Sequence, residues 1–132
     1  MKKLISLVLL CALLLSLTSC GTLNFVDIEE FSSEIYTDRD ITSAMEVVLE
    51  DFQGKNDRIL LKLSYAGDGA IADYADWAVR NNADDVIVFL TDYYISFFSD
   101  TPTQNAGSTY KNWGFILVRT RGGEWEIVDQ GY

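Results

Sequence analysis

Few side chains in this 132-residue chain could carry out chemistry, because the sequence contains no histidine. It therefore lacks the commonest general base near neutral pH and the usual activator of serine and cysteine nucleophiles. The leading candidate is Asp92, in the run Thr91-Asp92-Tyr93-Tyr94. A carboxylate inside a sheet can act as a base. Alternatively, the strand turns Asp92 outward or Asp92 caps the strand end, and we expect no catalytic residue.

Arg119 is the basic residue that we expect to be partly buried. It could hold an anionic ligand, or it could form a structural ion pair with Asp92 or Asp129. A buried ion pair fixes geometry without guaranteeing a net gain in stability. We favour the ion pair.

Aromatic residues bracket the loop that we expect over 99–109. Stacked rings beside polar loop groups suit the recognition of sugars or peptides. A sheet core also needs large residues, and aromatic residues favour strands. Core packing is the simpler reading of the set, with an exposed remnant at Phe97 and Phe98 that would mark a partner site. The bracketing residues are Tyr93, Tyr94, Phe97, Phe98, Tyr110 and Trp113.

The N-terminus has the pattern of a secretory signal peptide. Two lysines follow Met1, and the almost wholly apolar run 4–17 is shorter than the roughly 20 residues that span a bilayer. The following Leu17-Thr18-Ser19-Cys20 resembles a lipobox. This resemblance implies cleavage after residue 19 and a diacylglycerol on the thiol of Cys20. The alternative is an ordinary secretory signal that leaves a free thiol.

These expectations place the protein outside the cytoplasm, anchored to the cell membrane by the lipid on Cys20. They divide the chain into a signal peptide (1–19), a lipidated cysteine with its tether (20–35), and one domain (36–132). The mature 113 residues carry 20 acidic and 8 basic side chains, a net charge of −12. Such a surface repels phosphate backbones, which excludes nucleic acid as a partner, and it should also stand off from anionic lipid. Cys11 leaves with the signal and Cys20 is acylated, so no disulfide is expected.

No metal or cofactor is expected either. Asp38 and Asp40 could open a calcium loop, but Ser43 and Leu49 stand where that loop needs glycine and a bidentate glutamate. Asp84 and Asp85 are more simply explained as a solvated turn.

Periodicity predicts two helices. The first begins with a capping box at Thr37-Asp38-Arg39-Asp40, continues with apolar residues at helical spacing to Phe52, and stops at Gly54. The second follows a turn at 66–69, with Asp68 as candidate N-cap, and ends at Asn81-Asn82. Its expected apolar side consists of Ile71, Tyr74, Ala75, Ala78 and Val79.

Four strands are predicted, over residues 58–65, 86–95, 113–120 and 125–130. In the first, Ile59, Leu61, Leu63 and Tyr65 should share one face. The second is apolar on both faces at its start, which is typical of a central strand. Gly122-Gly123 indicates a two-residue hairpin turn between the last two. We therefore expect an α+β fold in which a curved, mainly antiparallel four-stranded sheet carries two helices on one face.

This arrangement resembles the nuclear-transport-factor-like and cystatin-like cones. The resemblance rests on the N-terminal amphipathic helix and on a terminal hairpin that reads Trp113 to Arg119, Gly122-Gly123, and Trp125-Glu126-Ile127-Val128-Asp129. Cone enzymes generally carry more helices before the sheet and a histidine or an Asp-Arg pair in the pocket. This chain departs from that pattern on both counts.

Three functions follow as hypotheses. The first is a non-enzymatic binding domain that contacts another protein or envelope component. The second is a pocket domain for a sugar, peptide or anion, and the third is an enzyme based on Asp92. The candidate contact residues are Asp92, Tyr94, Phe97, Phe98, Trp113 and Arg119.

Overall fold

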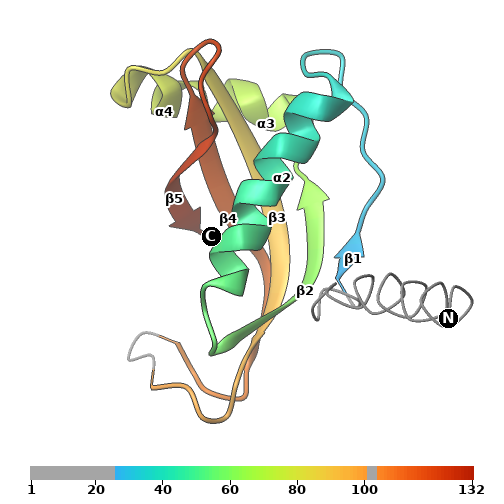
Figure 1. Ribbon diagram of the computed structural model, residues 1–132, viewed down its shortest axis with the longest axis vertical. Helices are drawn as coiled ribbons and strands as arrows, with labels where there is room; N and C mark the ends of the chain where they lie inside the picture. Colours follow the sequence, from blue (N-terminus) through green and yellow to red (C-terminus); the bar gives the residue numbers. More distant parts are fainter. Residues whose placement is uncertain (1–25, 101–103) are drawn as a thin grey trace, which may run out of the picture.

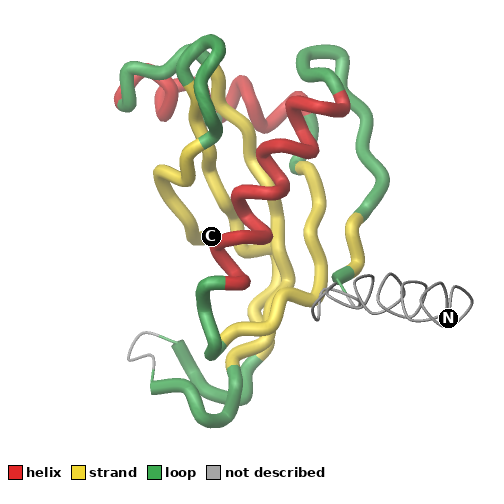
Figure 2. Tube along the Cα trace, in the orientation of Figure 1, coloured by secondary structure: helices red, strands yellow, loops and turns green. Residues whose placement is uncertain are grey.

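The computed structural model describes residues 26–100 and 104–132. Its α+β architecture is a five-stranded sheet in the order β1-β2-β3-β4-β5, with helices before and between the strands (Figures 1 and 2). The pair β1–β2 is parallel and the other pairs are antiparallel. The strands are β1 (Asp27–Ile28), β2 (Arg58–Tyr65), β3 (Asp85–Ile95), β4 (Thr109–Arg119) and β5 (Glu126–Gly131).

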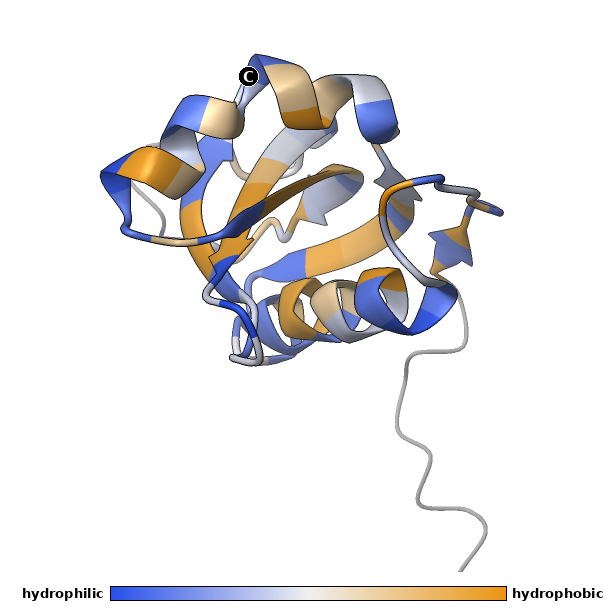
Figure 3. Cartoon of the chain, turned by 90° about the horizontal axis from the view of Figure 1, so that it is seen from above, coloured by the Kyte–Doolittle hydropathy of each residue, from blue (hydrophilic) through white to orange (hydrophobic). Residues whose placement is uncertain are grey.

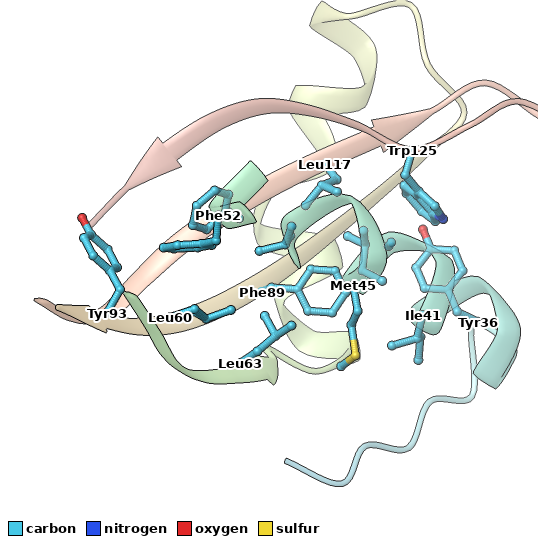
Figure 4. Packing of buried hydrophobic residues seen from close by; sticks show 14 of the residues in the cluster. Tyr36, Ile41, Met45, Phe52, Leu60, Leu63, Phe89, Tyr93, Leu117 and Trp125 are labelled. Atoms are coloured by element: carbon cyan, nitrogen blue, oxygen red, sulfur yellow. The ribbon is translucent and has the colours of Figure 1, made fainter. Parts of the chain in front are cut away.

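Helix α2 (Asp38–Gln53) confirms the first predicted helix and its capping box. The Thr37 hydroxyl accepts a hydrogen bond from the amide of Asp40, and the Asp40 carboxylate accepts one from the amide of Thr37. Gly54 is the C-cap residue. The apolar face of α2 lies on the sheet and is buried at Ile41, Ala44, Met45, Val48 and Phe52 (Figure 4).

The second predicted helix is two short helices, α3 (Asp68–Asp73) and α4 (Ala75–Arg80). The helical path breaks at Tyr74, where φ is −110° and ψ is 13°. This break changes the phase of the apolar side, so Ala75 and Val79 are exposed and the prediction for both is wrong. Asp68 is not the N-cap either, because Gly67 holds that position and makes no side-chain cap.

The helices cover both faces of the sheet, which corrects the expectation that both would pack on one face (Figure 3). Side chains of a strand alternate between faces, so Ile87 and Phe89 lie toward α2 while Val86 and Val88 point the other way. The second group packs with Ala78 and its neighbours in α3 and α4. A strand that is apolar on both faces requires both layers, and β3 is the central strand as predicted.

The sheet also has a fifth strand, which the sequence did not predict. Asp27 and Ile28, in the expected tether, pair in parallel with Lys62 and Leu63. Val26 and Phe31 pack against the core beneath α2. Two residues are too few to produce a readable alternation of apolar and polar side chains.

Irregularities in strand pairing also change the predicted faces. A register shift between Leu60 and Lys62 places one extra residue, Leu61, in β2. Ile59 consequently opposes Tyr94 on the face away from α2, whereas Leu63 is fully buried on the α2 side. The prediction that Ile59, Leu61 and Leu63 share a face is therefore wrong.

The connection between the two strands of the terminal hairpin is longer than predicted. Strand β4 ends at Arg119 and β5 begins at Glu126, so residues 120–125 connect them instead of two glycines. Gly122 has a φ of 76°, in the region that favours glycine. Trp125 belongs to this connection, where its buried ring packs edge-on against Tyr36.

The face of the sheet that points away from α2, here called the outer face, is covered in part by α3 and α4, and this covering can be tested directly. We expect Val88→Asp to lower the free energy of unfolding by at least about 3 kcal/mol, because it buries an unpaired carboxylate beneath α3 and α4. Ile59→Asp is the matched control on the same face, and it should cost about 1 kcal/mol or less. Val88 is 3% exposed and Ile59 is 55% exposed. Urea unfolding measures both; equal, small losses would contradict a covered outer face.

Candidate functional site

Asp92 lies on the face of β3 that points away from α2. Its neighbour Tyr93 is fully buried against Phe52 of α2, and successive strand residues alternate. The Asp92 carboxylate accepts a hydrogen bond from the amide of Asn112 at 2.9 Å. The strand register therefore turns Asp92 outward, which is the structural alternative that the sequence left open.

The hydrogen bond of Asp92 stabilises a bulge in β4. Thr91 pairs with Trp113 and Tyr93 with Tyr110, so Asp92 alone opposes Lys111 and Asn112. Asn112 has a φ of 54°, a left-handed conformation that asparagine tolerates better than most residues. An acceptor for the amide of this residue has a structural role, and Asp92 supplies it.

Arg119 forms two ion pairs at the opposite end of the sheet. Its Nε donates to Asp85 at 2.8 Å, and its Nη1 donates to Asp40 at 2.8 Å. Its guanidinium also lies 4.4 Å from the centre of the Trp125 ring. The expected structural ion pair exists, but its partners are Asp40 and Asp85 and not Asp92 or Asp129.

Asp40 joins this ion pair to the start of α2. Hydrogen bonds from Arg119 and from Thr37 hold the pKa of Asp40 down, from its ordinary 3.8 to about 2. Burial raises the pKa of the neighbouring Tyr36 to about 12, and its hydroxyl donates to the carbonyl of Val86 at 2.8 Å. This cluster connects α2, β3 and β4 through groups that are already paired.

The sequence did not single out a second polar cluster, which connects residues 33–36 to α3. The Asp68 carboxylate accepts hydrogen bonds from the Ser33 hydroxyl, the Tyr65 hydroxyl and the amide of Glu34. These bonds lower the pKa of Asp68, that from Ser33 contributing most. Asp68 after a turn suggested a helix cap, and no local signal shows a carboxylate bonded to residues 34 and 35 positions earlier.

The predicted aromatic group divides between two faces. Tyr93, Tyr110 and Trp113 form one cluster, in which the first two rings stack at 5.4 Å and both meet Trp113 edge-on. Tyr94 points to the other face and meets Phe97 edge-on. The structure therefore separates Trp113 from Tyr94, Phe97 and Phe98.

Three side chains that contact Tyr93 each hold a buried polar atom that makes no hydrogen bond with protein, although one of these atoms, Arg58 Nε, forms an ion pair with Asp57 at 3.8 Å. The Arg58 guanidinium lies 5.7 Å from the centre of the Tyr93 ring, and the Gln104 side chain donates to the Tyr93 hydroxyl. Arg58 Nε, Gln104 Oε1 and Trp113 Nε1 are buried yet make no hydrogen bond with protein. Buried polar groups are normally hydrogen-bonded, so these three could bind water or a small polar ligand.

The β3–β4 connection carries the exposed apolar residues. Phe97 is 75% exposed and Phe98 is 95% exposed. Gly107, at a φ of 77°, lies directly beneath Phe97, because a Cβ there would come within 2.7 Å of the Phe97 ring. Beside them on the outer face, Ile59 opposes Tyr94 across the β2–β3 pair. We name Ile59, Tyr94, Phe97 and Phe98 the tip patch.

The expected signal peptide and the expected lipid-acceptor residue, Cys20, lie outside the residues that the structure describes. Within residues 26–100 and 104–132, no group of three or more acidic, histidine or cysteine side chains could hold a metal ion. None of the helices described there is long and apolar enough to cross a membrane.

Comparisons with known proteins give no relationship. The chain matches no family model, no curated protein and no solved structure.

The ion pair of Asp40 should make stability depend on pH. Its folded pKa is depressed, so its contribution is present above pH 4 and is lost as the pH falls toward 2. Allowing for partial exposure, we expect a loss of about 1–2 kcal/mol across that range, which Asp40→Asn should remove. Asp38→Asn removes the same charge from the same helical turn and should leave the loss in place. Urea unfolding from pH 2 to pH 6 measures this, and identical profiles for both variants would contradict it.

Proposed function

We propose that this protein is a membrane-tethered extracytoplasmic lipoprotein whose domain binds a component of the cell envelope without catalysis. The tether is the expected lipid on Cys20, supported by the charged start, the short apolar run and Leu17-Thr18-Ser19-Cys20. Two acyl chains hold a protein durably at a bilayer, whereas one does not.

The tip patch is the observation that supports a binding role most strongly. Two adjacent phenylalanines exposed at 75% and 95% have no part in the core, yet they remain in water at the end of a hairpin. Exposed apolar groups that adjoin one another mark contact sites more often than isolated ones. Asp92 and Arg119 already have structural partners, which favours binding over catalysis.

The cone-like fold also stays a proposal. One long helix crosses the concave face of a twisted antiparallel sheet, as in the cones that the sequence resembles (Figure 1). The parallel edge strand β1 and the helices on the outer face are departures from our expected version of that fold.

Photo-crosslinking in cells tests the binding role. A photoreactive amino acid in place of Phe98 should yield a specific lipid or protein adduct, whereas one in place of Val79 should yield none. Val79 is a matched control because it is 76% exposed and lies on α4, at the opposite end of the sheet from the tip (Figure 1). Mass spectrometry of the mature chain should find the lipid, and Cys20→Ser should release the protein from the membrane fraction. The absence of an adduct at Phe98 would contradict the binding role, and a non-acylated chain would contradict the tether.

A second candidate function is the recognition of a small polar molecule near Tyr93. It is favoured by the three buried polar atoms of Arg58, Gln104 and Trp113 that make no hydrogen bond with protein. Its weakness is that the layer between α2 and the sheet is already filled, as Tyr93, Phe89 and Phe115 are almost completely buried (Figure 4).

A thermal-shift panel of sugars, cell-wall fragments, peptides and small anions tests this candidate on the mature protein. A ligand at 100 times its dissociation constant adds about 2.7 kcal/mol, which raises the melting temperature by several degrees. Trp113→Phe keeps the aromatic ring but removes the Nε1 donor, so it should reduce the shift. A flat panel would eliminate the small-molecule candidate.

A further inference from the structure

We infer that the tip patch docks on the lipid surface of the membrane that holds the Cys20 anchor, with Phe97 and Phe98 inserted among the headgroups and upper acyl chains. This inference rests on the proposed lipid anchor and names the partner of the tip patch.

The N-terminal end of β1 faces the tip end of the sheet. Strand β1 runs parallel to β2, so the N-terminal end of β1 faces the end of the sheet at which β2 begins. Arg58, the first residue of β2, pairs with Ile95, the last residue of β3. The tip follows Ile95 directly, and α3 and α4 lie at the other end of the sheet (Figure 1).

The chain is long enough for anchor and tip to reach the same bilayer. Asp27 pairs with Lys62, four residues from the start of β2, which corresponds to about 13 Å along the strand. Cys20 lies six residues before Val26, and six residues span at most about 20 Å. The anchor can therefore lie level with the tip without unpairing β1.

The two segments that lead into and form the tip carry little net charge, whereas the segment that contains α3 and α4 is acidic. The segment 50–62, which leads into and forms most of β2, has three acidic and three basic residues, and 92–113 has two acidic and one basic. These two segments sum to −1. The segment 63–91, which contains α3 and α4, has five acidic residues and one basic residue, a sum of −4. Anionic lipid would repel the segment with α3 and α4 more strongly than these two segments. Segment 26–49, which includes β1 and α2 up to Leu49, has seven acidic residues and one basic residue, a sum of −6.

The size and chemistry of the patch favour lipid over a protein partner. A stable protein interface buries about 800 Å² on each partner, whereas an aromatic side chain supplies about 150–250 Å². The tip patch has four side chains, fewer than the roughly 20–30 residues that each partner contributes to such an interface. They suffice to hold a tethered domain in one orientation, with the phenylalanines in the apolar layer and the Tyr94 hydroxyl available to headgroups.

Fluorescence quenching in vesicles tests this inference. The test uses acylated mature chains, residues 20–132, that carry Phe98→Cys or Val79→Cys. Each is labelled with the fluorophore NBD and reconstituted in phosphatidylcholine vesicles that contain doxyl-labelled lipids. The introduced cysteine is then the only free thiol, because Cys11 has been removed and Cys20 is acylated. We expect a blue shift and loss of emission at Phe98→Cys, with neither at Val79→Cys.

The outcomes separate the inference from the proposed function. An acylated chain whose label at position 98 stays unquenched overturns lipid docking and leaves the tether intact. Equal quenching at both positions also overturns it, because the tip would then not be the oriented end. A chain that mass spectrometry finds non-acylated overturns both. Circular dichroism of both labelled variants confirms that each is folded before reconstitution.

Discussion

The fold depends on the burial of one face of α2 against the sheet. Apolar residues of the helix occupy the same layer as Phe89, Tyr93 and Phe115, and this layer contains most of the side chains that are fully removed from water. Hydrophobic burial is the main favourable term for a domain of this size. The helix also packs on strands β2, β3 and β5. The register shifts between paired strands bend the sheet locally.

The two ends of this layer differ in chemistry. At the start of α2, Arg119 joins Asp40 and Asp85 beneath the rings of Tyr36 and Trp125. An arginine there satisfies two carboxylates at once and stacks on aromatic rings, which lysine cannot match. At the end of α2, the sheet continues into a hairpin with aromatic residues on its surface and no comparable ion pair between elements among its described residues. Ion pairs connect elements at one end of the molecule, and exposed aromatic side chains lie at the other.

This difference between the two ends supports the proposed binding function. The side chains most capable of acid-base or anion chemistry stabilise the fold: Asp92 supports the bulge at Asn112, and Arg119 joins three elements. Phe97 and Phe98, by contrast, are 75% and 95% exposed, and neither belongs to the buried core. We propose that the exposed apolar tip of this protein acts by contact and orientation rather than by reaction.

The sequence by itself determined the elements whose signals are local. The capping box at Thr37, the spacing of apolar residues along α2, and the two-sided apolar pattern that makes β3 central all depend on neighbours a few residues apart. The tertiary structure alone decided which face each strand residue occupies, because a single extra residue at Leu61 or Asn112 reverses the alternation beyond it. It also decided the partners of Arg119, since Asp40 is 79 residues away in the chain. Long-range pairing leaves no periodic trace in the sequence. For that reason the sequence named Tyr94, Phe97 and Phe98 but missed Ile59, and it grouped them with Trp113 and Arg119, which lie elsewhere in the structure.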